Sequence, residues 1–291
     1  MNFFVLIRSY IEFSLFKVII LLLNLFPKKI SSNIISNSFL YLGRLTKYHL
    51  IAKKNCGIVF PNLNKNEITS IINKSWKNLG YNLFELTYLN KLISEKNLIE
   101  IKGIKFLERI KKESSPVIFF SIHSSNWEIC VPILDRNGFN TGAVYRHINN
   151  KFFDRYIFKK RMESLNSRNS FYTPKGKVSA KEILKGIINN KNIFLLVDQK
   201  DSAGNLIEFF GKKVQTQTGF LKIARKYKLK IVPIKNIRLP NNKFQITFEE
   251  PLEHNNYQIS DDKKMLEINS IVERWIKENP ETWFWQHKRF N

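Results

Sequence analysis

Residues 117–128 read VIFFSIHSSNWE, and this stretch decides the fold. Residues 117–122 are apolar except for one serine, and the polar segment that follows begins at His123. A short, nearly continuous apolar run predicts a β-strand buried on both faces, which is typical of a parallel sheet. In such sheets, ligands bind just beyond the carboxyl ends of the strands. We therefore expect a functional site to begin at His123.

The same pattern extends along the chain on both sides of this strand. Further apolar runs lie at 142–145, 193–197, 231–234 and 244–248. Amphipathic, helix-like stretches alternate with them near 125–136, 150–166, 178–190, 216–228 and 262–278. This alternation predicts an α/β fold with a mostly parallel central sheet flanked by helices. Upstream, Asn64 and Glu67 have the spacing of a capping box, which predicts that a helix begins there.

The N-terminal residues 3–26 form the most apolar stretch, FFVLIRSYIEFSLFKVIILLLNLF. It is long enough to cross a bilayer, although Arg8, Glu12 and Lys17 interrupt it. The first 55 residues contain eight Lys or Arg against the single acid Glu12, which favours a cytoplasmic location for the rest of the chain. We expect a membrane-anchoring helix that either spans the bilayer or lies along an anionic surface. A buried helix of a soluble protein is the alternative.

Length and charge set the domain organisation and the classes of partner. The 291 residues divide into an anchor over 1–29, a helical segment over 30–95 and an α/β domain over 96–291. There are 48 Lys+Arg against 24 Asp+Glu, and a net charge of +24 favours an anionic membrane, a phosphorylated substrate or a nucleic acid. Because no nucleic-acid-binding module is present, we expect no nucleic acid partner. Cys56 and Cys130 provide no disulfide framework, which indicates a reducing compartment.

Polar side chains follow three of the expected strands. They are His123 and Glu128 after 117–122, Arg146 after 142–145, and Asp198, Gln199 and Lys200 after 193–197. A carboxylate that accepts one ring N–H of His123 would fix its tautomer and leave the other nitrogen free to take a proton. Glu128, five positions later, is our candidate for that carboxylate. A capping His followed by a Glu at a helix N-terminus would give the same spacing.

The motifs that are missing narrow the chemistry. No GxSxG surrounds any serine, and neither a Walker A nor a GxGxxG segment occurs. The histidines are too scattered to predict a metal site, and we expect neither a metal nor a cofactor. A His–carboxylate base without a protein nucleophile is suited to activating a substrate hydroxyl for attack on an acyl donor.

The motifs resemble those of bacterial lipid A biosynthesis acyltransferases, within the HxxxxD/E glycerolipid acyltransferase superfamily. HSSNWE at 123–128 is similar to the family's HxGNWE box. Further similar segments follow in order: VYR at 144–146, LLVDQ at 195–199, FFGKKVQTQTG at 209–219, Pro233, and PETWFWQHKRF at 280–290. The chain departs from the family at Ser125, where Gly is usual, and at Val214, where Ala is usual. The resemblance is weakest over residues 30–95.

This resemblance implies an O-acyltransferase of the glycerolipid-acyltransferase type at the cytoplasmic face of the bacterial inner membrane. Its donor would be acyl-acyl carrier protein, and its acceptor a hydroxyl of a 3-hydroxyacyl chain on a phosphorylated glycolipid, the lipid A precursor. His123 would be the general base and Glu128 would hold its imidazole.

The remaining candidate residues are expected to bind substrate. Arg146 would bind phosphate or the developing oxyanion, with a surface ion pair as the alternative. Asp198 and Gln199 would orient Arg146 or the donor, and Lys200 would face sugar phosphates or water. Two rival functions stay open: acylation of a lysophospholipid, glycerol phosphate or another glycolipid by the same residues, and a basic protein that binds nucleic acid or a membrane surface without catalysis.

Overall fold

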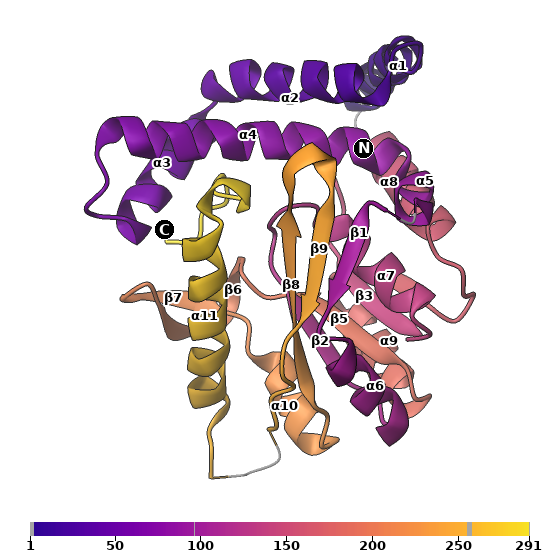
Figure 1. Cartoon of the computed structure of the whole chain (residues 1–291), viewed down its shortest axis with the longest axis vertical. Helices are drawn as coiled ribbons and strands as arrows, with labels where there is room; N and C mark the ends of the chain where they lie inside the picture. The colour runs from indigo at the N-terminus through magenta and orange to yellow at the C-terminus, as the bar shows by residue number, and fades with distance from the viewer. Residues whose placement is uncertain (1–2, 96, 255–257, 291) are drawn as a thin grey trace.

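The computed structural model describes residues 3–95, 97–254 and 258–290. In these residues the centre is a sheet of seven strands: β1 (Ile99–Lys102), β2 (Ile118–Ser121), β3 (Thr141–Tyr145), β4 (Phe171–Pro174), β5 (Asn192–Leu196), β8 (Ile231–Arg238) and β9 (Phe244–Phe248). Their order is β1-β9-β8-β2-β5-β3-β4 (Figure 1). The strands from β8 to β4 run parallel, and β9 pairs antiparallel with β8. The predicted α/β fold with a mostly parallel sheet is confirmed.

Helices surround this sheet. They are α1 (Phe3–Leu23), α2 (Lys28–Arg44), α3 (Lys47–Val59), α4 (Lys65–Thr87), α5 (Leu89–Ser94), α6 (Ile104–Glu113), α7 (Cys130–Arg136), α8 (Lys151–Glu163), α9 (Lys177–Ile188), α10 (Gly219–Lys226) and α11 (Asp261–Glu278). Short 3₁₀ turns are η1 (Trp127–Ile129), η2 (Pro240–Asn242) and η3 (Pro280–Thr282). A separate antiparallel pair consists of β6 (Lys200–Phe209) and β7 (Lys212–Thr216). The capping box at Asn64 and Glu67 is present at the start of α4, as predicted.

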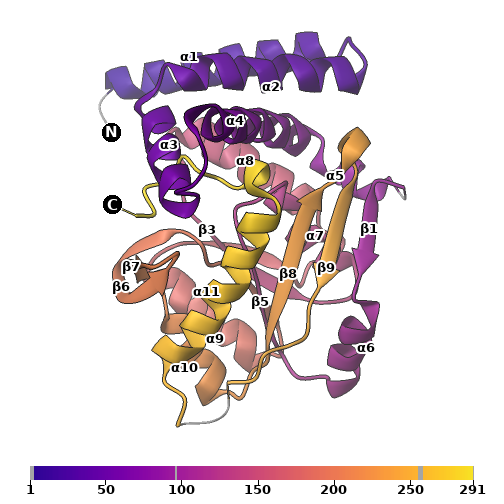
Figure 2. The same cartoon turned by 60° about the vertical axis from the view of Figure 1, so that its left-hand side comes forward.

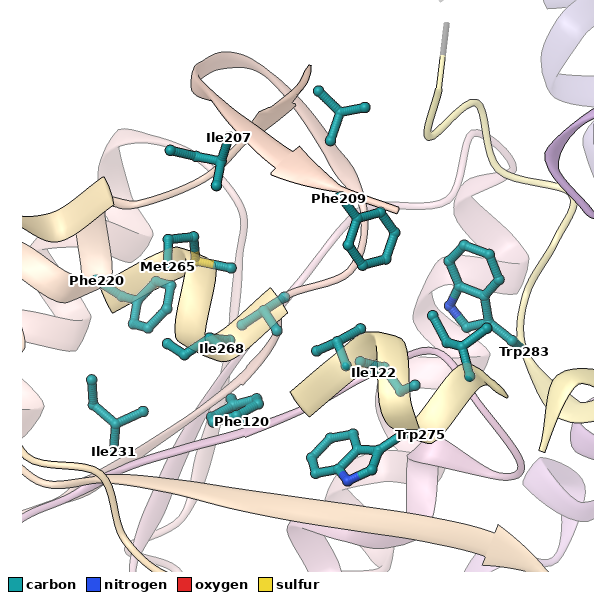
Figure 3. Close-up of a cluster of buried hydrophobic side chains, with 14 of the residues drawn as sticks. Phe120, Ile122, Ile207, Phe209, Phe220, Ile231, Met265, Ile268, Trp275 and Trp283 are labelled. Atoms are coloured by element: carbon teal, nitrogen blue, oxygen red, sulfur yellow. The ribbon is translucent and has the colours of Figure 1, made fainter. Parts of the chain in front are cut away.

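Alternation along the central strands sends side chains into two cores, one on each face of the sheet. Ile118, Phe120 and Ile122 belong to the core that α10 and α11 cover (Figure 3). Val117 and Phe119 belong to the core on the other face, with residues of α6 and α7. Since both faces of β2 are covered, a nearly continuous apolar run is the sequence that this strand requires.

The helices α2 and α4 lie across one end of the sheet, the end at which β8 finishes (Figures 1 and 2). They approach backbone to backbone, because a Cβ added at Gly80 of α4 would lie 2.5 Å from the Cα of Ser36 in α2. Glycine is the residue that permits such close contact. One face of α4 is thereby fixed against α2, and another face is directed towards the carboxyl ends of the central strands.

The N-terminal helix α1 packs against α8 through aromatic rings. Phe13 lies 5.4 Å from Phe153 and 5.8 Å from Tyr156, measured between ring centroids. No helix in residues 3–95, 97–254 and 258–290 is long and apolar enough to cross a membrane. The predicted anchoring helix is therefore not supported as a span, because charged residues interrupt α1.

The division of the chain into three segments stays a prediction. Its boundary at residue 96, and the terminal residues 1–2 and 291, lie outside the described residues. Both cysteines, Cys56 and Cys130, are buried free thiols.

Candidate active site

His123 and Asp198 meet at the carboxyl ends of two neighbouring strands. The strands β2 and β5 are parallel, with Ser121 opposite Leu196, so the residues that follow them emerge side by side. The backbone N–H of His123 donates to Oδ2 of Asp198 at 3.0 Å, and its Nδ1 lies 2.8 Å from Oδ1. Asp198 is 3% exposed, so its carboxylate is held away from bulk water.

The charge on Asp198 determines which nitrogen of the imidazole carries a proton. Burial by itself would raise the pKa of this carboxyl, but the charge and hydrogen bonds of His123 and the hydrogen bond from Trp283 hold the pKa below its usual value. An ionised carboxylate can only accept hydrogen bonds, so Nδ1 of His123 is the donor. Its Nε2 makes no hydrogen bond to any described residue and is left as an acceptor. His123 thus has the tautomer that a general base requires.

The C-terminal segment forms a second wall of the site. Trp283 donates from Nε1 to Oδ2 of Asp198 at 2.8 Å, and the N–H of Phe284 donates to the carbonyl of His123 at 2.9 Å. The rings of Trp127 and Phe284 lie 5.2 and 6.2 Å from the imidazole centroid. These aromatic rings leave the imidazole only partly exposed and limit the access of water to it.

Glu128 does not orient the imidazole, and that prediction is wrong. Both of its carboxylate oxygens accept hydrogen bonds from Arg161 of α8, each at 2.7 Å. Burial would raise the pKa of Glu128, but Arg161, with a smaller contribution from the nearby His123, holds the pKa below its usual value. The local backbone explains the direction of Glu128: Ser125 is left-handed, with φ of 55°, and Asn126 caps η1 by accepting the N–H of Glu128 at 3.1 Å. The turn therefore directs Glu128 towards α8.

The other candidate residues lie at the same end of the sheet with different environments. Arg146 follows β3 and is exposed. The carbonyl of Gln199 lies 3.5 Å from Nη1 of Arg289. Lys200 is half-buried at the start of β6, opposite Thr216. Asp198 contacts His123 and Trp283, and so its expected role in orienting Arg146 is replaced by a role beside the imidazole.

Two basic residues near the C-terminus were not among the predicted site residues. Arg289 is buried and donates to the carbonyl of Gln215 at 2.8 Å; burial lowers the pKa of its guanidinium to about 10, against the opposing effect of Asp198. Burial also lowers the pKa of His287 to about 4, with Asp198 opposing and Arg146 contributing to the decrease. His287 is thus neutral at physiological pH and lies within electrostatic reach of Arg146. The W-x-W-x-H-x-R pattern at the C-terminus was the signal that marked this segment.

The chemistry that the site permits follows from these contacts. In the described part of the chain, no three His, Cys, Asp or Glu side chains lie together in a group that could hold a metal ion. The free Nε2 of His123 can accept a proton from a hydroxyl, and the imidazolium that results would be stabilised by Asp198. Arg146 offers an exposed cation directly after β3, at the same end of the sheet.

Comparison with known proteins identifies the family of this chain. The family model described as bacterial lipid A biosynthesis acyltransferase matches residues 3–291. The chain is 21% identical over 258 residues to the lipid A biosynthesis palmitoleoyltransferase of Escherichia coli strain K12 and to the lipid A biosynthesis acyltransferase of Shigella flexneri, which covers 84% of this chain and 79% of each relative. A structural comparison with the 1-acyl-sn-glycerophosphate acyltransferase of Thermotoga maritima gives a TM-score of 0.41 at 12% identity, over 89% of this chain and 100% of that one. The chain belongs to the bacterial lipid A biosynthesis acyltransferase family.

Proposed function

We propose that this protein transfers a fatty acyl chain from acyl-acyl carrier protein to a hydroxyl of a 3-hydroxyacyl chain on a phosphorylated lipid A precursor. The observation that carries the proposal is the His123–Asp198 pair, in which Nε2 of the imidazole stays free at the carboxyl end of the sheet. Family membership supports the lipid substrate class. The acyl carrier protein as donor and the secondary position of the acyl chain come from the motif resemblance.

In the proposed reaction His123 acts on the acceptor hydroxyl. Its Nε2 takes the hydroxyl proton while the oxygen attacks the thioester carbonyl, so that a C–O bond forms and the C–S bond breaks. Asp198 stabilises the imidazolium during this step, and the proton then passes to the departing thiolate. The products are an ester and a free thiol, and no covalent intermediate on the protein is needed. General base catalysis of this kind contributes on the order of 10²–10⁴-fold.

Arg146 is the proposed contact for an anionic group of the substrates. Its guanidinium is exposed directly after β3, and its charge contributes to the lowered pKa of His287, which supports this role. A guanidinium binds phosphate with two parallel hydrogen bonds, a geometry that orients the ligand as well as attracting it. Gln199 and Lys200 follow Asp198 directly and are proposed to contact the donor or a sugar phosphate.

The surface that we propose for membrane binding is formed by α1 and α2. Large apolar side chains are exposed along both helices, among them Phe3, Phe4, Ile11, Leu15, Val18, Leu22, Ile34, Tyr41 and Leu42. Both helices lie at the top of the molecule in Figures 1 and 2, where α2 follows α1 in the chain. The adjoining Lys28 and Lys29 would attract anionic headgroups. We therefore propose that the protein works at the cytoplasmic face of the inner membrane, with this edge on an anionic lipid surface.

The test is an acyl transfer assay read by mass spectrometry. Purified full-length protein is incubated with acyl-acyl carrier protein and a tetra-acylated phosphorylated disaccharide, presented in vesicles with and without anionic lipid. We expect the acceptor to gain the mass of one acyl chain, with the protein sedimenting with the anionic vesicles. Parallel reactions use acyl-coenzyme A as donor or a lysophospholipid as acceptor. Transfer to the lysophospholipid with none to the disaccharide would contradict the proposal.

A further inference from the structure

The turn that carries His123 contains a residue in an unfavourable backbone conformation. Ser125 has φ of 55°, in the left-handed region that residues other than glycine rarely adopt. Its side chain is fully buried, and its hydroxyl makes no hydrogen bond to the described residues. Ser125 therefore neither prefers this conformation nor gains a side-chain hydrogen bond from it. Other groups must hold the turn in place.

Two asparagines of α4 bind the carbonyl of Ser125. Nδ2 of Asn78 donates to it at 3.0 Å, and Nδ2 of Asn82 makes a second, short hydrogen bond to the same oxygen. Asn78 also donates to the carbonyl of Thr282 at 3.1 Å, so one amide group contacts both the His123 turn and the C-terminal wall. The i,i+4 spacing places both asparagines on one face of α4. Both side chains are buried.

A third residue of the same face, Glu85, binds the next residue of the turn. Its Oε2 accepts a hydrogen bond from Nδ2 of Asn126 at 2.8 Å. Glu85 is 1% exposed, so its charge needs a partner inside the protein. That partner is Arg238, the last residue of β8, whose Nη1 lies 2.6 Å from Oε1 of Glu85.

Arg238 connects the three residues of α4 to one another. Its Nε donates to Oδ1 of Asn78 at 2.9 Å, and its Nη2 donates to Oδ1 of Asn82 at 2.7 Å. Because the guanidinium occupies the amide oxygens, both NH₂ groups are directed at Ser125. The orientation of each amide is therefore determined by the network.

We propose that Asn78, Asn82 and Glu85, held by Arg238, are positioning residues that set the direction of His123 through the backbone of Ser125 and Asn126. None of them contacts the imidazole. The inference rests on the proposed function, because it concerns the geometry of that same base. A shift of about 1 Å in a catalytic group costs roughly 10²-fold in rate. Loss of this network should therefore lower kcat more than it changes KM.

The test compares Asn82→Ala, Asn78→Ala and the double variant Asn82→Ala/Ser125→Gly in the full-length protein. We expect each single variant to stay folded and to lose about 10- to 100-fold in kcat, with KM changed less than about threefold. Gly adopts the left-handed conformation without strain, so Ser125→Gly in the Asn82→Ala background should restore at least part of kcat. Asn66→Ala, on the exposed first turn of the same helix, is the matched control and should keep the activity of the natural protein.

Hydrogen exchange of the peptide 122–128 gives a readout that does not need substrate. In Asn82→Ala we expect its amides to exchange about tenfold faster, because the turn opens locally more often. Unchanged exchange with unchanged kcat in both single variants would overturn the positioning role. So would a loss that appears in KM alone, or no recovery on adding Ser125→Gly. Failure of the natural protein to transfer acyl chains would instead overturn the proposed function, while the exchange experiment would still report on the network.

Discussion

Replacing Asp198 with Asn should lower kcat by about 10²–10⁴-fold, the range over which a general base contributes. An amide can present its NH₂ group to Nδ1 of His123, which would then keep its proton on Nε2 and could not act as a base. Asn is nearly isosteric with Asp, so the fold should persist. Steady-state acyl transfer measures the effect, and circular dichroism verifies folding.

Further variants test whether His123 and Asp198 act as a pair. His123→Ala should lose at least as much activity, and the double variant His123→Ala/Asp198→Asn should be no worse than His123→Ala, because residues that act as a unit are not additive. Asp262→Asn is the matched control, since Asp262 is exposed at the start of α11 and accepts a hydrogen bond from Asn205. Additive losses in the double variant, or near-normal turnover of Asp198→Asn, would contradict the assignment of Asp198.

Glu128→Gln should destabilise the protein by about 3–5 kcal/mol, the usual result of removing one partner of a buried ion pair. The side chain of Glu128 is 10% exposed and that of Arg161 is 15% exposed. Without Glu128, the charge on Arg161 would stay buried without its partner. Urea denaturation followed by circular dichroism measures the free energy of unfolding.

The matched control is Glu163→Gln, in the same helix as Arg161. Glu163 pairs with Lys160 at 2.9 Å on a more exposed surface, and its replacement should change stability by at most about 1 kcal/mol. Adding Arg161→Met to Glu128→Gln should recover part of the loss, because no buried charge is then left unpaired. If Glu128→Gln unfolds at the same urea concentration as the natural protein but loses its catalytic activity, Glu128 is a catalytic group rather than a partner of Arg161.

The sequence predicted the central strands because their residues are apolar on both faces. In β2 and β5, alternate side chains enter different cores, so the apolar run reports burial directly. The strands β1 and β4 were not predicted. They are short, and their side chains are mostly only half-buried, so their apolar pattern is weak. The capping box of α4 was predicted because it depends on residues three positions apart.

Residues around the site were predicted with unequal success for a physical reason. His123 and Asp198 are 75 positions apart and meet because β2 and β5 are adjacent, an order that local patterns do not contain. Glu128 is close in sequence, and its spacing from His123 gave no sign that Ser125 adopts a left-handed conformation. The polar stripe of Asn78, Asn82 and Glu85 has the spacing of a solvated helix face. In the folded protein these three side chains are buried and bind Arg238 at the end of β8, a contact that the pattern of α4 alone does not predict.

The most direct test of the central claim is the tautomer of His123, measured by ¹⁵N NMR on protein labelled at histidine nitrogen, with Asp198→Asn as the comparison. With the ring neutral, we predict that the proton of His123 resides on Nδ1 and that Nε2 is bare, so that it can accept a proton from an alcohol. A proton found on Nε2 in the natural protein would contradict the account, because His123 could not then act as the base.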